Sequence, residues 1–237
     1  MGADMSACGA AVCAPTNRGG DLSKTDGKMH AEDSADGHIT SKVKHFVVKE
    51  KLFSWEGSFF NIKDERGEVA YRVTRKQLVR EDQMIIYTKS GQKLCLLQKR
   101  IMTITPTFHI FTYMPNAPGQ ISTDSEGGTP VFRFALIQQE PCGYRPRCRF
   151  SLYLGKSIPT QIWTGEMQSG TDAEHMVIIS ADSGAVVGYT EQVPSALEFA
   201  ERDTYAVSAA RHMDALSLIV FAISADEMRS ELTRRLL

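Results

Sequence analysis

The sequence predicts an all-β fold with one helix: a closed antiparallel barrel of roughly a dozen strands around a hydrophobic C-terminal α-helix. Short runs rich in Val, Ile, Phe and Tyr recur from Val43 onward and are separated by turn residues. No helical pattern interrupts these runs until Asp214. A single apolar segment then follows, from Ala215 to Ala225, with Ser217 and Ser224 as its polar exceptions. Many strands and one late helix are the basis of the prediction.

Three segments share one hairpin design, in which two apolar runs are joined by a polar turn. The turns close on Gly67, Gly91 and Gly184. Glycine is expected there because these turns require positive φ, which strains a residue that carries a Cβ. The predicted hairpins are Phe59 to Val73, Met84 to Gln98 and Met176 to Thr190.

The remaining body of the chain continues the same pattern. Many short strands without intervening helices favour a closed barrel or a sandwich of two sheets. The additional strands are expected at Thr107 to Tyr113, Val131 to Gln139, Arg147 to Leu154, Thr160 to Thr164 and Thr204 to Ala210, with loops at Pro115 to Pro130 and Glu140 to Pro146.

The apolar segment after Asp214 decides between those two architectures. A helix that is apolar on nearly every side must be buried on nearly every side, and a barrel wrapped around it achieves this most simply. Asp214 is placed to cap its start, and Asp226 with Glu227 predicts a return to solvent. The segment is shorter than the ~20 apolar residues that cross a bilayer, so no transmembrane span is expected. The predicted core residues of the helix are Leu216, Leu218, Ile219, Val220, Phe221 and Ile223.

The charge of the chain is balanced overall and uneven locally. Its 237 residues hold 27 Lys and Arg against 28 Asp and Glu, which argues against a dedicated nucleic-acid binder. Residues 41 to 100, however, carry 14 basic and 7 acidic side chains. The excess is compatible with solvated strand faces or with an anionic partner such as lipid headgroups, and both interpretations stay open.

Strand alternation identifies which basic residues face water. From Ala70 to Lys76, Tyr71 and Val73 fall on one face, while Arg72 and Lys76 fall on the other with Thr74. The candidates for headgroup contact in this segment are Lys63, Arg72, Arg75, Lys76, Arg80, Lys93, Lys99 and Arg100.

The N-terminus carries a motif for lipid attachment. MGADMS matches the M-G-x-x-x-[ST] pattern for N-myristoylation on Gly2, and Cys8 and Cys13 are placed for a second acyl chain. One myristoyl chain binds a membrane only marginally, so a second anchor or a basic patch is needed. Residues 1 to 41 hold few large apolar side chains and are expected to form a disordered tether, acylated or unmodified.

Motifs for catalysis and metal binding are absent from the sequence. The five cysteines contain no C-x-x-C pair, and no G-x-S-x-G, H-E-x-x-H, Walker or dinucleotide motif occurs. A metal site from Cys142, Cys148 and His109 or His175 has weak support from spacing, as does a Cys–His nucleophile. We therefore expect no enzyme activity, no cofactor, no metal, and reduced thiols in a cytoplasmic setting.

The body of the chain resembles the LURP-one-related proteins, relatives of the Tubby C-terminal domain and of phospholipid scramblases. The matching pieces are Val47 to Val73, Gly91 to Arg100 with the following Phe108 to Tyr113 strand, and Asp214 to Met228. The resemblance implies a 12-stranded antiparallel barrel threaded by the C-terminal helix, occupying residues 42 to 237.

The resemblance also implies a class of function. Tubby-like domains hold phosphoinositides and scramblases mix lipids, whereas no enzyme activity is established for the LURP-one branch. The chain lacks the Pro-rich N-terminus and the acidic calcium segment of scramblases. We expect a cytoplasmic module at the membrane surface that binds anionic, phosphoinositide-like headgroups or acts as a tethered adaptor; a protein-interaction scaffold is the alternative, and scrambling a more remote one.

The acylation motif gives the first testable prediction. Gly2→Ala replaces the N-terminal glycine that N-myristoylation requires and does not alter the barrel. In cells that myristoylate proteins, the wild type should partition to membranes and Gly2→Ala should move to the soluble fraction. Identical fractionation of the two proteins would show that the motif is not used.

Overall fold

Thirteen β-strands and one helix make up the described part of this computed structural model, which comprises residues 42–51, 58–77, 81–100, 105–114, 121–140, 148–155, 159–168, 175–192 and 204–236. The first strands are β1 (Lys44–Lys51), β2 (Ser58–Lys63), β3 (Val69–Gln77), β4 (Glu81–Thr88), β5 (Lys93–Arg100), β6 (Thr107–Thr112) and β7 (Ile121–Thr123). The others are β8 (Pro130–Gln139), β9 (Arg149–Leu154), β10 (Thr160–Gln168), β11 (His175–Ser180), β12 (Val186–Gln192) and β13 (Thr204–Ala209), followed by α1 (Ala215–Leu236).

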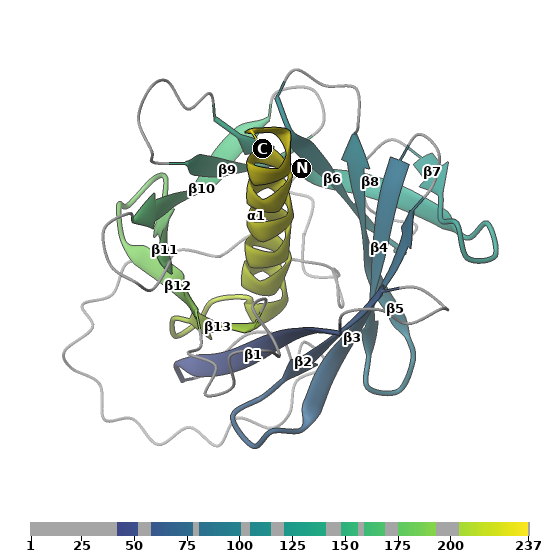
Figure 1. Ribbon diagram of the computed structural model, residues 1–237, viewed down its shortest axis with the longest axis horizontal. Helices are drawn as coiled ribbons and strands as arrows, with labels where there is room; N and C mark the ends of the chain where they lie inside the picture. Colours follow the sequence, from purple (N-terminus) through teal and green to yellow (C-terminus); the bar gives the residue numbers. More distant parts are fainter. Residues whose placement is uncertain are drawn as a thin grey trace, which may run out of the picture.

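Twelve of the strands form a closed antiparallel ring, which confirms the predicted barrel (Figure 1). Each ring strand pairs with the next one along the chain, β6 pairs with β8, and β13 pairs with β1. A chain that runs up and down can close antiparallel only with an even number of strands. The ring meets that condition because β7 stands outside it, paired only with the start of β8.

The three predicted hairpins are confirmed as β2–β3, β4–β5 and β11–β12. The turn glycines have the positive φ that the sequence implies: +76° at Gly67, +87° at Gly91 and +68° at Gly184. In the first turn the Gly67 amide donates to the Asp64 carbonyl oxygen at 2.9 Å. Turn chemistry was therefore a reliable guide to where the chain reverses.

Strand β7 lies inside the segment that the sequence predicts as a loop, Pro115 to Pro130. Its three residues are too few to show an alternating pattern, so the sequence gives no strand signal for them. The turn after it is fixed by Asp124 and Thr129, whose backbone groups pair at 3.0 Å. The β7–β8 hairpin covers a second apolar cluster on the outside of the barrel, formed by Ile85, Leu96, Phe111 and Val131.

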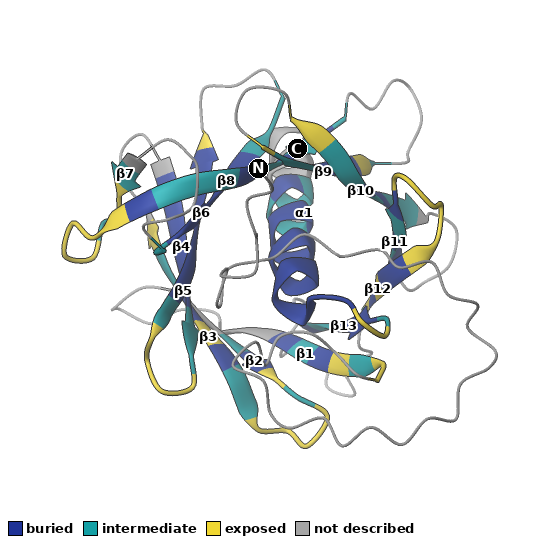
Figure 2. Ribbon diagram, turned by 180° about the vertical axis from the view of Figure 1, so that it is seen from behind, coloured by how far each residue is buried: buried dark blue, intermediate teal, exposed yellow. Residues whose placement is uncertain are grey.

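Helix α1 stands inside the ring, and its first three turns are buried on every side (Figures 1 and 2). All six predicted core residues are at most 2% exposed. Asp214 caps the helix as predicted, since its Oδ1 accepts from the Leu216 amide at 3.1 Å. The wall fits closely: a Cβ on Gly165 of β10 would lie only 2.6 Å from Cε1 of Phe221.

The helix does not end where the acidic pair predicts a return to solvent. It continues to Leu236, and Asp226 and Glu227 are only partly exposed. Both carboxylates have arginine partners, because Glu227 accepts from Arg75 at 2.8 Å and Asp226 from Arg229 at 3.0 Å. Arginine side chains, rather than water alone, therefore stabilise these two carboxylates, and the sequence pattern does not reveal such pairs.

The buried helix predicts a strong effect of charge in its centre. Ile219→Asp places an unpaired carboxylate at a position that is 0% exposed, so the free energy of unfolding should fall by on the order of 4 kcal/mol, out of the ~5–15 kcal/mol typical of a domain. The matched variant Ile219→Val should cost about 1 kcal/mol. Urea denaturation measures both; an Ile219→Asp protein as stable as Ile219→Val contradicts the central packing.

Candidate functional site: the basic outer wall and the helix-start rim

Strand β3 divides its side chains between the barrel interior and the outer wall. Tyr71 and Val73 are buried inside, while Arg72 and Lys76 are exposed outside, as alternation predicts. Two of the eight headgroup candidates are therefore available on the outer face of β3.

Two other candidates point into the barrel. Arg75 forms a fork to Asp82, with Nε 3.0 Å from Oδ2, and its Nη1 donates to Glu227 of the helix. Lys99 is buried on β5, with its ammonium 6.0 Å from the ring centre of Phe108. Both fill the end of the barrel where the helix leaves it, so the structure does not bring them together with Arg72 and Lys76.

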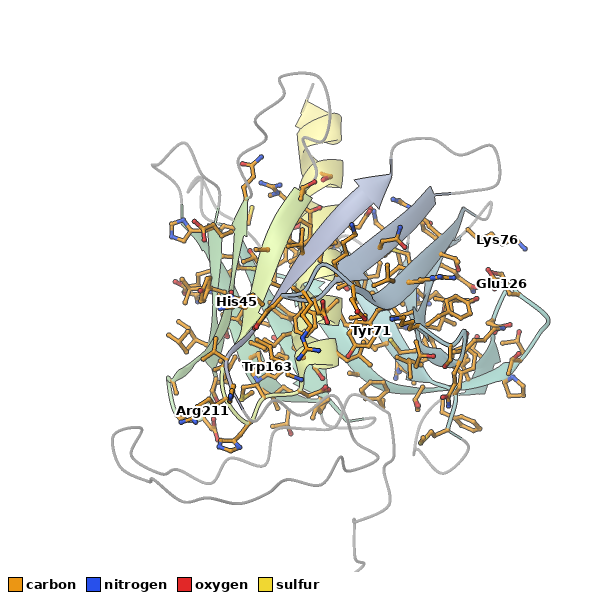
Figure 3. All side chains as sticks on the ribbon, turned by 90° about the horizontal axis from the view of Figure 1, so that it is seen from below. His45, Tyr71, Lys76, Glu126, Trp163 and Arg211 are labelled. Atoms are coloured by element: carbon orange, nitrogen blue, oxygen red, sulfur yellow. The ribbon has the colours of Figure 1, made fainter. Side chains whose placement is uncertain are left out.

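The turn between β7 and β8, residues 124–129, folds back over the outer wall of β3, β4 and β5. The Lys76 ammonium donates to the Ser125 carbonyl oxygen at 3.0 Å, and the Glu126 carboxylate accepts from Thr74 at 3.2 Å and from the Tyr87 hydroxyl. Figure 3 shows Lys76 and Glu126 side by side at one edge of the molecule. The turn therefore brings a negative charge next to the basic wall.

Lys93 is occupied by the same turn. Its ammonium lies 2.6 Å from Asp124 Oδ2 and 2.7 Å from the Glu126 carbonyl oxygen, and the Tyr113 hydroxyl donates to the same carboxylate. Burial alone would raise the pKa of Asp124, but hydrogen bonds from Lys93 and Tyr113 hold that pKa below its ordinary value. Lys93 thus secures the turn.

The exposed candidates are fewer than the sequence suggests. Lys63 on β2 and Arg100 on β5 are exposed, like Arg72 and Lys76. Within the described ranges, Lys63 and Arg72 have no ion-pair partner, and they lie on adjacent strands. Arg80 lies outside the described residues, as do Gly2, Cys8 and Cys13.

A further basic residue, Arg133, escaped the sequence analysis. It lies half-buried on β8, opposite Phe111 of β6 and on the strand that neighbours His109, in the part of the chain beyond the basic segment. Burial, Arg133 and Arg100 together lower the pKa of His109 to about 4. Counting charge by segment could not find Arg133, because its effect on His109 depends on the pairing of β8 with β6.

An open pocket of about 350 Å³ lies at the end of the barrel where α1 begins. Phe46 and Tyr71 form its apolar floor, with ring centres 6.3 Å apart. Lys44, His45 and Arg66 line it with polar groups. We call this end of the barrel, with residues 42–45, 64–68, 184–187 and 210–212, the helix-start rim.

Hydrogen bonds hold one side of the rim in place. The His45 amide donates to Glu65 Oε1 at 3.0 Å, and Nδ1 of His45 lies 2.7 Å from the Ser208 hydroxyl. Asp64 Oδ1 accepts from the amides of Arg66 and Glu68 within its own turn. The carboxylates of Asp64 and Glu65 are thus engaged by backbone amides.

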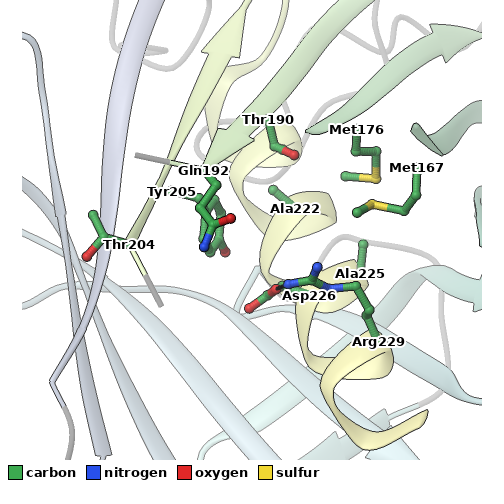
Figure 4. Close-up of a pocket in the computed structure, with 10 residues that line it drawn as sticks. All are labelled: Met167, Met176, Thr190, Gln192, Thr204, Tyr205, Ala222, Ala225, Asp226 and Arg229. Carbon is green, nitrogen blue, oxygen red and sulfur yellow. Dashed lines mark hydrogen bonds and ion pairs between the residues drawn. The ribbon is translucent and has the colours of Figure 1, made fainter. Parts of the chain in front are cut away.

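A smaller cavity of about 50 Å³ lies between α1 and the wall of β10 to β13 (Figure 4). Met167 and Met176 line one side, and Asp226 and Arg229 of the helix line another. This volume holds a few water molecules and no lipid headgroup. Of the two pockets described, only the one at the helix-start rim is large enough for a lipid headgroup.

The described ranges contain neither a cluster of metal ligands nor a membrane-spanning helix. These residues contain no group of three His, Cys, Asp or Glu side chains that could hold a metal ion. No helix among them is long and apolar enough to cross a membrane. Cys142 lies outside the described residues, and Cys148 accepts a hydrogen bond from Gln139 at 3.7 Å.

Comparison with known proteins agrees with this architecture. A family model described as LURP-one-related matches residues 44–226. An X-ray structure of a protein from Arabidopsis thaliana superposes with a TM-score of 0.50 at 10% identity, covering 81% of this chain and 95% of that one. At that identity the likeness concerns the fold alone. No curated protein matches the sequence.

The lowered pKa of His109 predicts a pH-dependent contribution to stability. Its folded pKa of about 4 lies below the ordinary 6.5, so the unfolded chain takes up the proton first as the pH falls. The contribution is complete above about pH 6.5 and is lost toward about pH 4. The free-energy difference between wild type and His109→Gln, measured by urea denaturation, should therefore shift against the wild type on acidification.

An NMR titration provides the control for this prediction. Arg133→Gln removes a neighbouring positive charge, so the His109 midpoint should rise in that variant. A wild-type midpoint at the ordinary histidine value would contradict the proposed environment of this ring.

Proposed function

This chain belongs to the LURP-one-related family, and from that premise we propose that it is a non-enzymatic module that binds anionic, phosphoinositide-like phospholipid headgroups at the cytoplasmic face of a membrane. The observation that carries the proposal is the pair Lys63 and Arg72. Both are exposed on neighbouring strands and have no ion-pair partner within the described ranges.

The filled interior supports binding on the outside. The inner face of the ring packs on α1, and the cavity beside the helix is only about 50 Å³. Near an anionic leaflet each exposed Lys or Arg contributes about 1 kcal/mol, and this attraction fades within a Debye length. A few such residues give weak, salt-sensitive binding, which an acyl chain on the expected Gly2 site would strengthen.

A scaffold that binds protein without lipid is the second candidate. Lys76 and Lys93 favour it, because both ammonium groups are already bonded to the turn of residues 124–129. The basic wall therefore offers fewer free charges to a membrane than the sequence count implies. The test below separates the two candidates.

Charge reversal at Arg72 tests lipid binding directly. The full chain without acylation should bind vesicles of phosphatidylcholine with added phosphatidylinositol phosphates, and binding should weaken with salt. Arg72→Glu should lower the partition constant about tenfold, since it replaces an attraction by a repulsion. Cosedimentation measures the bound fraction.

Arg149→Glu is the control for a charge reversal elsewhere on the surface, because Arg149 lies on β9, far around the ring from β3, and its charge is already paired with Glu140 and Glu166. This variant should keep most of the binding. If the wild type ignores anionic vesicles even at low salt, lipid binding is excluded and the scaffold takes its place.

A further inference from the structure

Exposed apolar side chains gather on one side of the barrel. Within the described ranges, the large hydrophobic residues that are exposed are Val43 (48%), Val186 (56%) and Tyr189 (40%). Val43 and Val186 flank the segment that leads into α1, because Lys44 pairs with Ala209 and the Ala210 amide donates to the Val187 carbonyl oxygen at 3.0 Å. Two aliphatic side chains thus project from the helix-start rim.

Four basic residues lie on the same rim as these two valines. Lys42, Arg66 and Arg211 are exposed at the rim, and Lys44 is half-buried beside them. Arg211 lies on the side of the molecule away from Lys76 and Glu126 in Figure 3. Lys44 and Arg66 also line the pocket of about 350 Å³, and neither has an ion-pair partner within the described ranges.

The acidic residues of the β2–β3 turn do not pair with Lys44 or Arg66. The Asp64 carboxylate accepts two amides of its own turn, and Glu65 accepts the His45 amide. Glu68 pairs with Lys89 at 3.0 Å. Aliphatic side chains that share a rim with cations are the composition that suits the interfacial region of an anionic bilayer.

We propose that the barrel docks on an anionic membrane by its helix-start rim, with Val43 and Val186 entering the headgroup region and Lys44 and Arg66 facing lipid phosphates across the pocket. This inference rests on the proposed lipid binding and adds its orientation. The membrane, rather than a protein, is the occupant because the chain enters the barrel here. Strand β1 begins at Lys44, so the predicted acyl chain on Gly2 is attached through the segment that ends at this rim.

Removal of the exposed valines tests the orientation. In the full chain, Val43→Ser with Val186→Ser should lower partition into vesicles of phosphatidylcholine and phosphatidylserine about tenfold, because two aliphatic contacts with the interface are lost. Tyr189→Ser is the control, since Tyr189 is exposed on the same strand two residues beyond the rim. Melting temperatures of all variants should match the wild type.

A fluorescence reporter locates the contact independently. Tryptophan placed by Val186→Trp should be quenched by brominated phosphatidylcholine in anionic vesicles, whereas Tyr189→Trp should not. The two native tryptophans are corrected for with the wild type. Lys44→Glu and Arg66→Glu should each weaken binding about fivefold, and more at low salt.

The outcomes separate this inference from the proposed function. If the wild type binds anionic vesicles, Arg72→Glu reduces binding, and the valine pair and the Val186→Trp reporter show no effect, then the wall is the contact and the rim orientation is overturned. If the wild type binds no vesicles, lipid binding and its orientation both fail. If a protein partner is lost with the valine pair while vesicle binding is unchanged, the rim is a protein site and the inference is again overturned.

Discussion

Burial of helix α1 by the inner face of the ring is the constraint on which the rest of the structure depends. A helix that is apolar all round has no solvated side, so the wall must surround it completely. The wall can approach the helix closely only where its side chains are small or fit the helix side chains. Gly165 leaves room for Phe221, and Trp163 packs edge-on against the Phe221 ring with ring centres 6.3 Å apart. Within the described residues, α1 occupies the interior and leaves beside it a cavity of only about 50 Å³.

The two ends of the barrel differ in how their charged side chains are arranged. At the exit of the helix, charges enter the interior and are matched there, with Arg75 joining Asp82 on the wall to Glu227 on the helix. At the start of the helix, Asp214 caps the first turn and the surrounding cations stay open to solvent. At the helix exit, Arg75 is therefore paired with two carboxylates. At the helix start, Lys44 and Arg66 have no ion-pair partner within the described ranges.

Sequence pattern predicted the fold better than the candidate site. Hairpin turns with glycine and the apolar segment after Asp214 are local signals, and each located its element. That the Arg75 side chain points into the barrel is harder to predict from the sequence, because its partners lie on another strand and on the helix. The rim was missed because Val43 and Val186 look like ordinary strand residues; only the β1–β13 and β12–β13 pairings place them together.

The pairing of β1 with β13 has a consequence for synthesis on the ribosome. The earliest strand of the barrel finds its second neighbour only after all the other strands have emerged, and the helix follows later still. Until then the inner faces of the early strands are uncovered and β1 is an open edge able to pair with other chains. Barrel closure therefore waits until β13 and α1 have been synthesised, and a chain stopped before α1 is a candidate for chaperone capture rather than a smaller folded protein.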